Sequence, residues 1–329
     1  ALIAPASPAP RGAAARAAEG LRSLGLIPEL FPSCTSLAEG GASCFTGSAA
    51  SYLSGSDALR ASDLLRAFTD DHIRGIFCLR GGYGSMRLLP LLDFQEIRKH
   101  PKVFCGFSDI TALHIALQQK CGFITFHGPM PQTDYRALDD YSRHSLQNAL
   151  FRHRFSFKNP PEEPLFPLFG GEADGILTGG NLTLIQSLQG SPYALHTEKK
   201  ILFLEEVNEP TYRIDRMLTS LRLSGALTGL SGILLGTFTK PGEEGPALPD
   251  SLLSLFREMF APLGIPVLRS PLSADNPSAR RANLFFGGFV PHWSLPRLRL
   301  LNDPFRQKSQ LPDFLFQPSQ KPQLTDTDR

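Results

Sequence analysis

Short continuous apolar runs alternate with segments of helical periodicity through the first part of the chain. The apolar runs predict strands at residues 2–4, 26–31, 76–79, 103–105 and 124–126. Runs without polar alternation are typical of strands that are buried on both faces of a sheet. Residues 13–24, 57–68 and 110–119 carry apolar side chains at helical spacing and predict helices. Strands that alternate with helices predict a parallel sheet with helical cover.

The pattern weakens after residue 134, and residues 158–167 are rich in proline and charge, which is typical of a linker. Farther along, strands are predicted at residues 176–178, 201–204 and 232–238, and helices at residues 181–188, 214–223 and 252–260. We therefore predict an α/β protein with an N-terminal doubly wound, mostly parallel sheet and a smaller, mixed or β-rich C-terminal domain. The predicted bounds are residues 1–135 and 169–303 for the domains, 136–168 for the linker and 304–329 for a Gln-, Pro- and Ser-rich tail.

Composition narrows the class of partner. A formal net charge of +2 indicates neither a nucleic acid nor an anionic membrane as partner. No apolar run approaches the roughly 18 residues that a membrane span needs. The opening residues, ALIAPASPAP, lack the basic region and long apolar core of a secretory signal, and they lack an initiator Met. The five cysteines are an odd number without metal-type spacing, which favours a reduced, cytoplasmic protein.

The first candidate for chemistry is Gly106-Phe107-Ser108-Asp109-Ile110, between a predicted strand and a predicted helix. A serine on a sharp strand-to-helix turn, a nucleophile elbow, exposes its hydroxyl beside the free amides of a helix N-terminus, which can hold an oxyanion. The alternative from the pattern alone is a structural N-cap, since Ser and Asp are favoured there.

Three further segments follow predicted strands. Arg80-Gly81-Gly82-Tyr83-Gly84 can bring backbone amides close to an anion, or can be a plain tight turn. The acidic segment at residues 204–209 can supply a carboxylate that orients a catalytic base, or can be solvated surface. Thr178-Gly179-Gly180-Asn181 reads as a well-capped helix start.

Taken in order, these segments resemble one family. The series comprises residues 80–84, 106–111, 128–130, 179–182, 204–209 and 212–218. It resembles the LD-carboxypeptidases (muramoyl-tetrapeptide carboxypeptidases), and the similarity runs from the first strand to about Pro266.

The resemblance implies a serine peptidase with Ser108 as nucleophile and Glu205 as the acid that orients the base. The backbone amides of Gly82 and Asp109 are the implied oxyanion donors. Family members remove the terminal D-alanine from murein tetrapeptide during peptidoglycan recycling in the cell wall. The resemblance further implies no metal or cofactor, a small peptide substrate, a cytoplasmic location and a homodimer.

The sequence departs from the family where its catalytic histidine belongs. After the Ile265-Pro266-Val267-Leu268 run, Asp275 stands at that position, and no His occurs from Thr197 to Pro291. An aspartate with the ordinary pKa of about 3.9 is a weak base unless burial or a neighbouring carboxylate such as Glu205 raises its pKa. His127 and His292 are the alternative bases.

Two alternatives to the active LD-carboxypeptidase remain open. One is a binding protein on the same scaffold that holds a peptidoglycan fragment with little or no hydrolysis. The other is a hydrolase of the microcin-immunity type, which cuts amide-linked aminoacyl nucleotides. An aromatic-rich insertion would favour the latter, and residues 151–169 hold several Phe but no Trp.

Overall fold

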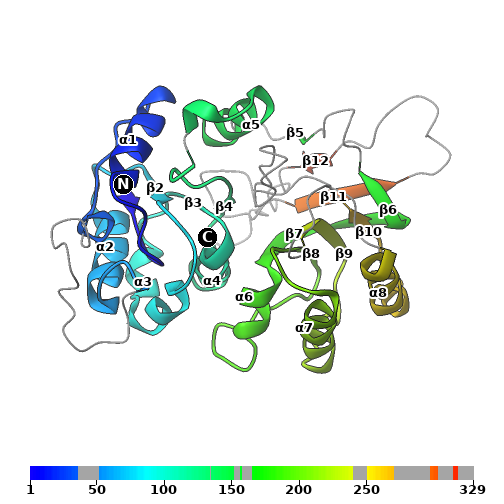
Figure 1. The fold of residues 1–329 in the computed structure, drawn as a ribbon. Helices are drawn as coiled ribbons and strands as arrows, with labels where there is room; N and C mark the ends of the chain where they lie inside the picture. Colours follow the sequence, from blue (N-terminus) through cyan, green and yellow to red (C-terminus); the bar gives the residue numbers. More distant parts are fainter. Residues whose placement is uncertain are drawn as a thin grey trace, which may run out of the picture.

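The computed structural model describes residues 1–35, 52–133, 135–151, 156–157, 165–239, 250–269, 297–302 and 314–317. Its strands form two sheets, one in each half of the chain (Figure 1). The N-terminal sheet has the order β1-β2-β3-β4, and all its neighbouring strands are parallel. Its strands are β1 (Leu2–Ile3), β2 (Gly75–Cys78), β3 (Val103–Gly106) and β4 (Phe126–His127).

Helices cover both faces of this sheet. Successive strand residues point to opposite faces, so neighbouring residues of one strand pack against different helices. On one face, Ile3, Ile76 and Phe104 pack with α2 (Asp57–Thr69) and α4 (Thr111–Ala116). The opposite face packs against α1 (Ala13–Ser23) and α5 (Asp140–Phe151). Leu2, Phe77, Cys105 and Phe126 belong to this second cluster. The predicted doubly wound, parallel sheet is therefore confirmed.

Short 3₁₀ and helical turns complete this half of the chain: η1 (Pro32–Cys34), η2 (Ser85–Leu91), α3 (Phe94–Ile97) and η5 (Tyr135–Ala137). Helix α5 lies within the segment that the sequence predicts as a linker, and its Leu146 and Ala149 are part of the N-terminal core.

The predicted strand at residues 26–31 was wrong. Only an isolated bridge forms there, between Leu30 and Leu2. Ile27 is 97% exposed, and Pro28 has no N–H to donate to a neighbouring strand. The hydrophobic run therefore does not mark a buried strand here.

The C-terminal sheet is mixed and has the order β5-β12-β11-β7-β8-β9-β10-β6. Its parallel centre consists of β7 (Gly171–Asn181), β8 (Lys200–Glu206), β9 (Gly232–Phe238) and β10 (Val267–Arg269). Antiparallel strands flank this centre: β5 (Ser156–Phe157), β6 (Phe166–Phe169), β11 (Arg297–Asn302) and β12 (Phe314–Gln317). Strand β12 lies in the segment predicted as a tail and pairs with β11.

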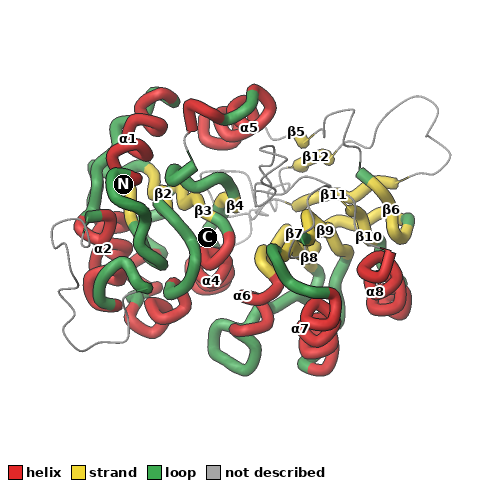
Figure 2. Tube along the Cα trace, viewed as in Figure 1, coloured by secondary structure: helices red, strands yellow, loops and turns green. Residues whose placement is uncertain are grey.

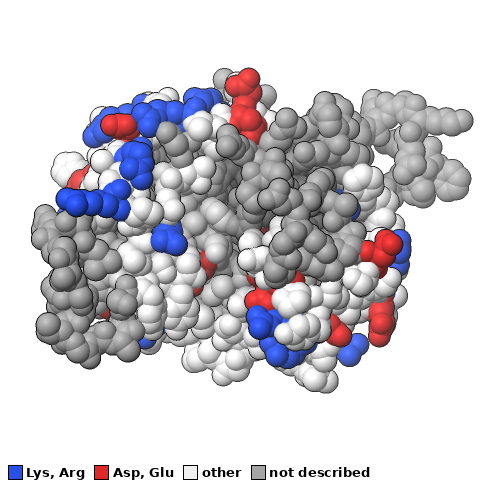
Figure 3. All heavy atoms as spheres, viewed as in Figure 1, with Lys and Arg blue, Asp and Glu red and all other residues white. Residues whose placement is uncertain are grey.

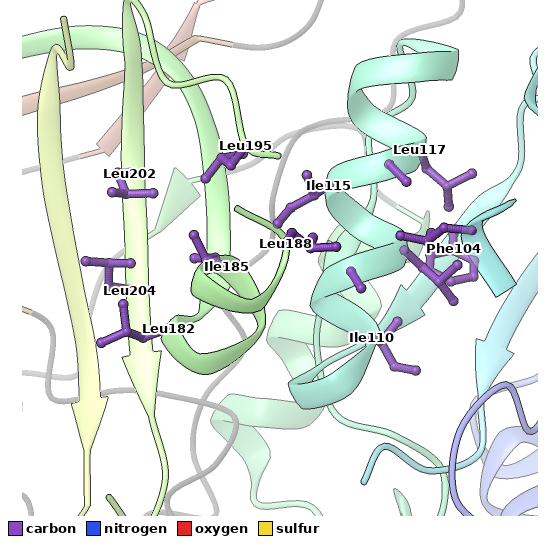
Figure 4. Packing of buried hydrophobic residues seen from close by; sticks show 14 of the residues in the cluster. Phe104, Ile110, Ile115, Leu117, Leu182, Ile185, Leu188, Leu195, Leu202 and Leu204 are labelled. Atoms are coloured by element: carbon purple, nitrogen blue, oxygen red, sulfur yellow. The ribbon is translucent and has the colours of Figure 1, made fainter. Parts of the chain in front are cut away.

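The helices of the second half are α6 (Leu182–Ser187), α7 (Thr211–Leu223) and α8 (Asp250–Phe260), followed by the 3₁₀ turn η6 (Ala261–Leu263). Figure 2 shows helices α6, α7 and α8 along one side of the C-terminal sheet, with α6 beside α4 of the other half. A single apolar cluster runs from α4 through α6 to β8. Figure 4 shows Ile115 of α4 beside Leu188 at the end of α6. The two halves therefore share one core, which holds the ends of β3 and β8 in a defined relation.

Acidic and basic side chains are interspersed on the C-terminal half in Figure 3, whereas Lys and Arg predominate along the upper edge of the N-terminal half. Among the helices that the structure describes, none is both long enough and apolar enough to cross a membrane.

Candidate active site

Ser108 lies on a strained turn between β3 and the helix that follows. Strand β3 ends at Gly106, and the 3₁₀ turn η3 (Ser108–Ile110) leads directly into α4. Ser108 has φ of 60°, a left-handed conformation that non-glycine residues seldom adopt and that costs roughly 1–3 kcal/mol. The N-cap residue of η3 is Phe107 and that of α4 is Ile110, so Ser108 caps neither element. The N-cap alternative for Ser108 is therefore wrong, and the strained turn fits a nucleophile elbow.

Glycines surround this turn at positions where a side chain would crowd its neighbours. A Cβ on Gly106 would lie 3.0 Å from Ile110 Cγ2 and 3.1 Å from Cys78 Cβ. A Cβ on Gly81 would lie 3.2 Å from the Cβ of Ser108 itself. Residues 80–84, the glycine loop that was predicted to approach an anion, therefore contact the turn at Ser108, which is called the nucleophile turn below.

Three sets of hydrogen bonds hold the glycine loop in place. The amide of Ser85 donates to the Asp109 carboxylate at 2.8 Å, and the Ser85 hydroxyl donates to the Asp109 carbonyl oxygen at 2.6 Å. The amide of Tyr83 donates to Ser7 Oγ at 3.1 Å. Arg60, which is fully buried, donates to the Gly84 carbonyl oxygen at 3.0 Å. The loop is thereby fixed to the nucleophile turn, to the segment after β1 and to α2.

The side chain of Asp109 has a structural role in this arrangement. Burial raises the pKa of Asp109, and its hydrogen bonds from Ser85 partly oppose that rise. Arg60 also donates to the carbonyl oxygen of Pro5 and to the Asp57 carboxylate. Burial lowers the pKa of Arg60, and the Asp57 carboxylate opposes this. Only the backbone amide of Asp109, directly after Ser108, is left for the predicted role of oxyanion donor.

The two acids at the end of β8 are both buried, so the solvated-surface alternative is wrong for them. Glu206 Oε1 accepts from Asn181 Nδ2 at 3.0 Å and from the Val207 amide at 2.9 Å. Glu206 Oε2 accepts from the Thr183 amide at 2.8 Å and from the Thr183 hydroxyl at 2.7 Å. With four donors around it, Glu206 fixes the start of α6 to the end of β8. Sequence reasoning assigned no function to Glu206.

Glu205, the predicted orienting acid, lies at an irregularity between β8 and β9. Leu204 pairs with Leu235, but Glu206 pairs with Phe238, so β9 carries one extra residue opposite Glu205. Bulges of this kind re-aim side chains and are common beside active sites. A Cβ on Gly236 would lie 3.2 Å from Glu205 Cβ, so glycine leaves room for the acid there.

A hydrogen bond joins strand β7, which pairs with β8, to the helix that follows Ser108. Asn181 pairs with Glu205 in the register of β7 and β8. The amide of Asn181 donates to Thr111 Oγ1 at 3.1 Å, and Thr111 lies three residues after Ser108. The structure thus brings Ser108 and the strand end that carries Glu205 to the same interface between the two halves.

Two buried histidines lie beneath the nucleophile turn. His114 Nε2 lies 2.8 Å from the Gly106 carbonyl oxygen and donates to it, and burial lowers the pKa of His114 to about 4. The His127 ring lies edge-on to Phe203, with 5.4 Å between the ring centroids. Burial, with His114 nearby, lowers the pKa of His127 well below its ordinary value. A lower pKa weakens His127 as a base, which favours a structural role over the predicted substitution for the family histidine.

Asp275 and His292 lie outside the described residues. No group of three or more His, Cys, Asp or Glu side chains that could hold a metal ion occurs in the part of the chain that the structure describes. The predicted site residues with a described position are therefore Ser108, Gly82, Asp109 and Glu205.

Comparison with known proteins decides the family. Residues 1–128 match the model of the LD-carboxypeptidase N-terminal domain, and residues 174–273 match that of the LD-carboxypeptidase C-terminal domain. A probable murein peptide carboxypeptidase from Bacillus subtilis is 42% identical over 224 residues, which cover 66% of this chain and 69% of that protein. The chain belongs to the LD-carboxypeptidase family. A second family relative, the murein tetrapeptide carboxypeptidase of Pseudomonas aeruginosa, is 34% identical over 232 residues, covering 66% of this chain and 72% of that protein.

Solved structures agree with this LD-carboxypeptidase fold. The muramoyltetrapeptide carboxypeptidase from Oxalobacter formigenes has a TM-score of 0.73 at 26% identity, over 95% of this chain and 97% of that one. MccF in complex with glutamyl sulfamoyl guanosine has a TM-score of 0.74 at 22% identity, over 96% of this chain and 95% of that one, and shows the fold alone. The C-terminal family match ends at residue 273, before Asp275.

Proposed function

We propose that this chain is a serine-type LD-carboxypeptidase that releases the terminal D-alanine from murein tetrapeptide in peptidoglycan recycling. The observation that carries the proposal is the strained backbone of Ser108, with φ of 60°, beside the glycine loop. Such strain persists where the surrounding structure enforces it, and it is common at active sites. The names of the relatives from Bacillus subtilis and Pseudomonas aeruginosa supply the substrate class.

In the proposed reaction, Ser108 Oγ attacks the carbonyl carbon of the amide that precedes the D-alanine. The amides of Gly82 and Asp109 stabilise the oxyanion that forms. The proton of Ser108 passes to a base and then to the departing amino group, and water hydrolyses the resulting acyl-enzyme. Glu205 orients the base.

We propose Asp275 as that base. Two carboxyl groups that share one proton raise the pKa of one member of the pair, and Asp275 would act as a base in such a pair with Glu205. A carboxylate remains a poorer match than imidazole, whose pKa of about 6.5 lies near working pH. The proposed enzyme is therefore slower than a relative that has the histidine.

D-alanine release from purified murein tetrapeptide, followed by mass spectrometry, tests these assignments. We expect turnover in the parent chain, a loss of about 10³-fold or more in Ser108→Ala, and faster turnover in Asp275→His. Turnover that survives Ser108→Ala would contradict the serine mechanism. An inactive parent that gains activity in Asp275→His would instead indicate a binding protein that retains the remaining site.

The fold shared with MccF favours a second candidate, an amide hydrolase that acts on aminoacyl sulfamoyl nucleosides. Aspartyl sulfamoyl adenosine in the same assay separates the two. Cleavage of this compound without cleavage of the tetrapeptide would support the second candidate.

We further propose a homodimer that acts in the cytoplasm. Light scattering of the purified chain at several concentrations tests the dimer. A mass of one chain at all concentrations would contradict it.

A further inference from the structure

The helix that begins at Ser108 is joined to the C-terminal half at both of its ends. The 3₁₀ turn η3, α4 and the π-helical turn η4 (Leu117–Cys121) follow one another without a break. Residues 108–121 therefore form one continuous helical segment, called here the nucleophile helix. Its position relative to the C-terminal half determines where Ser108 lies relative to Glu205.

The far end of the nucleophile helix is held by Gln118 and Gln119. Gln118 Nε2 donates to the Leu177 carbonyl oxygen at 2.9 Å, and the Thr178 hydroxyl donates to Gln118 Oε1 at 2.5 Å. Gln119 Nε2 donates to the Ala194 carbonyl oxygen at 3.1 Å, and the His196 amide donates to Gln119 Oε1 at 2.7 Å. Each amide side chain thus donates one hydrogen bond and accepts one across the interface.

The near end is held by one buried hydrogen bond close to Ser108. Thr111 is fully buried, and its Oγ1 accepts from the amide of Asn181 at 3.1 Å. Gly180 permits this close approach, because a Cβ there would lie only 2.5 Å from Thr111 Oγ1. Asn181 Nδ2 then donates to Glu206 at 3.0 Å, and Glu206 immediately follows Glu205. A continuous hydrogen-bonded chain therefore runs from the nucleophile helix to the end of β8.

The burial of these groups makes the chain of bonds restrictive. Asn181 is 5% exposed and Glu206 is 3% exposed, so neither has bulk water as a ready alternative partner. A buried donor that loses its acceptor retains its full desolvation cost. The buried hydrogen bonds therefore favour a single position of one half relative to the other. Displacements of about 1 Å at a reacting centre cost roughly 100-fold in rate.

We propose that Thr111 and Glu206 are positioning residues for the reaction, acting through Asn181 to set Ser108 relative to Glu205. This inference rests on the proposed function. The two ends of the nucleophile helix then have different roles. The end at Thr111 sets the geometry of the reacting groups, whereas the end at Gln118 and Gln119 only attaches the helix to the C-terminal half.

Thr111→Val tests the near end, because it keeps the shape of the side chain and removes the acceptor oxygen. We expect kcat for D-alanine release to fall about 10- to 100-fold with KM within about twofold of the parent. Thr111→Ser keeps the oxygen and is expected to restore kcat to within about threefold. Gln119→Ala is the matched control, since it removes two hydrogen bonds at the far end of the same helix and is expected to leave kcat within about twofold.

Glu206→Gln tests the other end of the chain of bonds. It keeps the size of the side chain but turns an NH₂ group towards donors, and we expect a fall in kcat similar to that of Thr111→Val. Thermal unfolding of all four variants accompanies the kinetics. A folded Thr111→Val with parental kcat would overturn the inference, as would losses that follow stability alone and are equal in Gln119→Ala.

The rate at which a fluorophosphonate labels Ser108 separates this inference from the proposed function. A parent that is labelled but releases no D-alanine contradicts the substrate alone, and slower labelling in Thr111→Val than in Gln119→Ala still supports the positioning role. Equal labelling of those two variants contradicts the positioning role. A parent that shows neither labelling nor turnover contradicts both.

Discussion

Replacing His114 by Gln is expected to change how the stability of this protein depends on pH. His114 is buried below the nucleophile turn, and its Nε2 donates to the Gly106 carbonyl oxygen at 2.8 Å. A Gln side chain can donate to the same oxygen but has no proton to gain between pH 4 and pH 7. The substitution therefore removes the titration of one group while it keeps a donor.

The expected magnitude follows from the two pKa values of the imidazole. The pKa of His114 is lowered by burial to about 4 in the folded protein, against about 6.5 when unfolded. Between these two pKa values the unfolded chain binds the additional proton. The contribution of His114 to stability is therefore fully present above about pH 6.5 and is lost as the pH falls towards 4. Over this window, linkage lowers the free energy of unfolding by about 2 kcal/mol between pH 7 and pH 4.5 through this one group.

Urea unfolding at pH 7, 6, 5 and 4.5, followed by circular dichroism, measures this term. We expect the free energy of unfolding of His114→Gln to fall less over this range than that of the parent, by about 2 kcal/mol. The difference between the two proteins matters, because His127 and the carboxyl groups titrate in both. Parallel pH profiles for parent and variant would refute the conclusion that His114 is buried in its neutral form.

Three further substitutions or reactions test other parts of the structure. Gly81→Ala places a methyl group 3.2 Å from Ser108 Cβ, so we expect D-alanine release to fall about tenfold or more with a change in unfolding free energy of only about 1 kcal/mol. Gly179→Ala puts its Cβ 2.1 Å from the Phe203 carbonyl oxygen at φ of 121°, and thermal unfolding should report a loss of about 3 kcal/mol or no folded protein. Burial raises the pKa of Cys105 to about 12, so its thiol should react with Ellman's reagent only after denaturation, as peptide mapping of the modified chain will show.

Local patterns in the sequence predicted elements whose stability depends on local burial. The predicted helix at residues 57–68 agrees closely with α2 (Asp57–Thr69), because its apolar residues at helical spacing, Leu64 and Phe68, are those that the sheet buries. The strand predicted at residues 176–178 is only the centre of β7 (Gly171–Asn181). Glycines interrupt the hydrophobic pattern of β7, because Gly171 lies close to the Pro266 side chain and Gly175 and Gly179 lie where the backbone of Lys199 and Phe203 approaches closely.

Contacts between distant segments could not be predicted in this way. Nothing in the local pattern around Arg60 marks it as buried, yet it is fully buried and donates to the Gly84 carbonyl oxygen, 24 residues away. Thr111 gave no signal either, since its partner Asn181 is 70 residues farther along the chain. The resemblance to a family predicted Ser108 and Glu205, whereas the hydrogen bonds that hold their surroundings follow only from tertiary packing.

The adjacent acids at the end of β8 show why two similar residues take different roles. Side chains alternate along a strand, so Glu206 lies on the face of Leu202 and Leu204, which pack with α6, and Glu205 lies on the face of Phe203. The α6 face offers Glu206 donors that use both of its oxygens. The opposite face places Glu205 on the same side as Phe203, against which the His127 ring packs at the interface with the nucleophile half. Strand alternation thus places the two acids on opposite faces of β8, so that Glu206 holds the strand to α6 and Glu205 stays available for its proposed role.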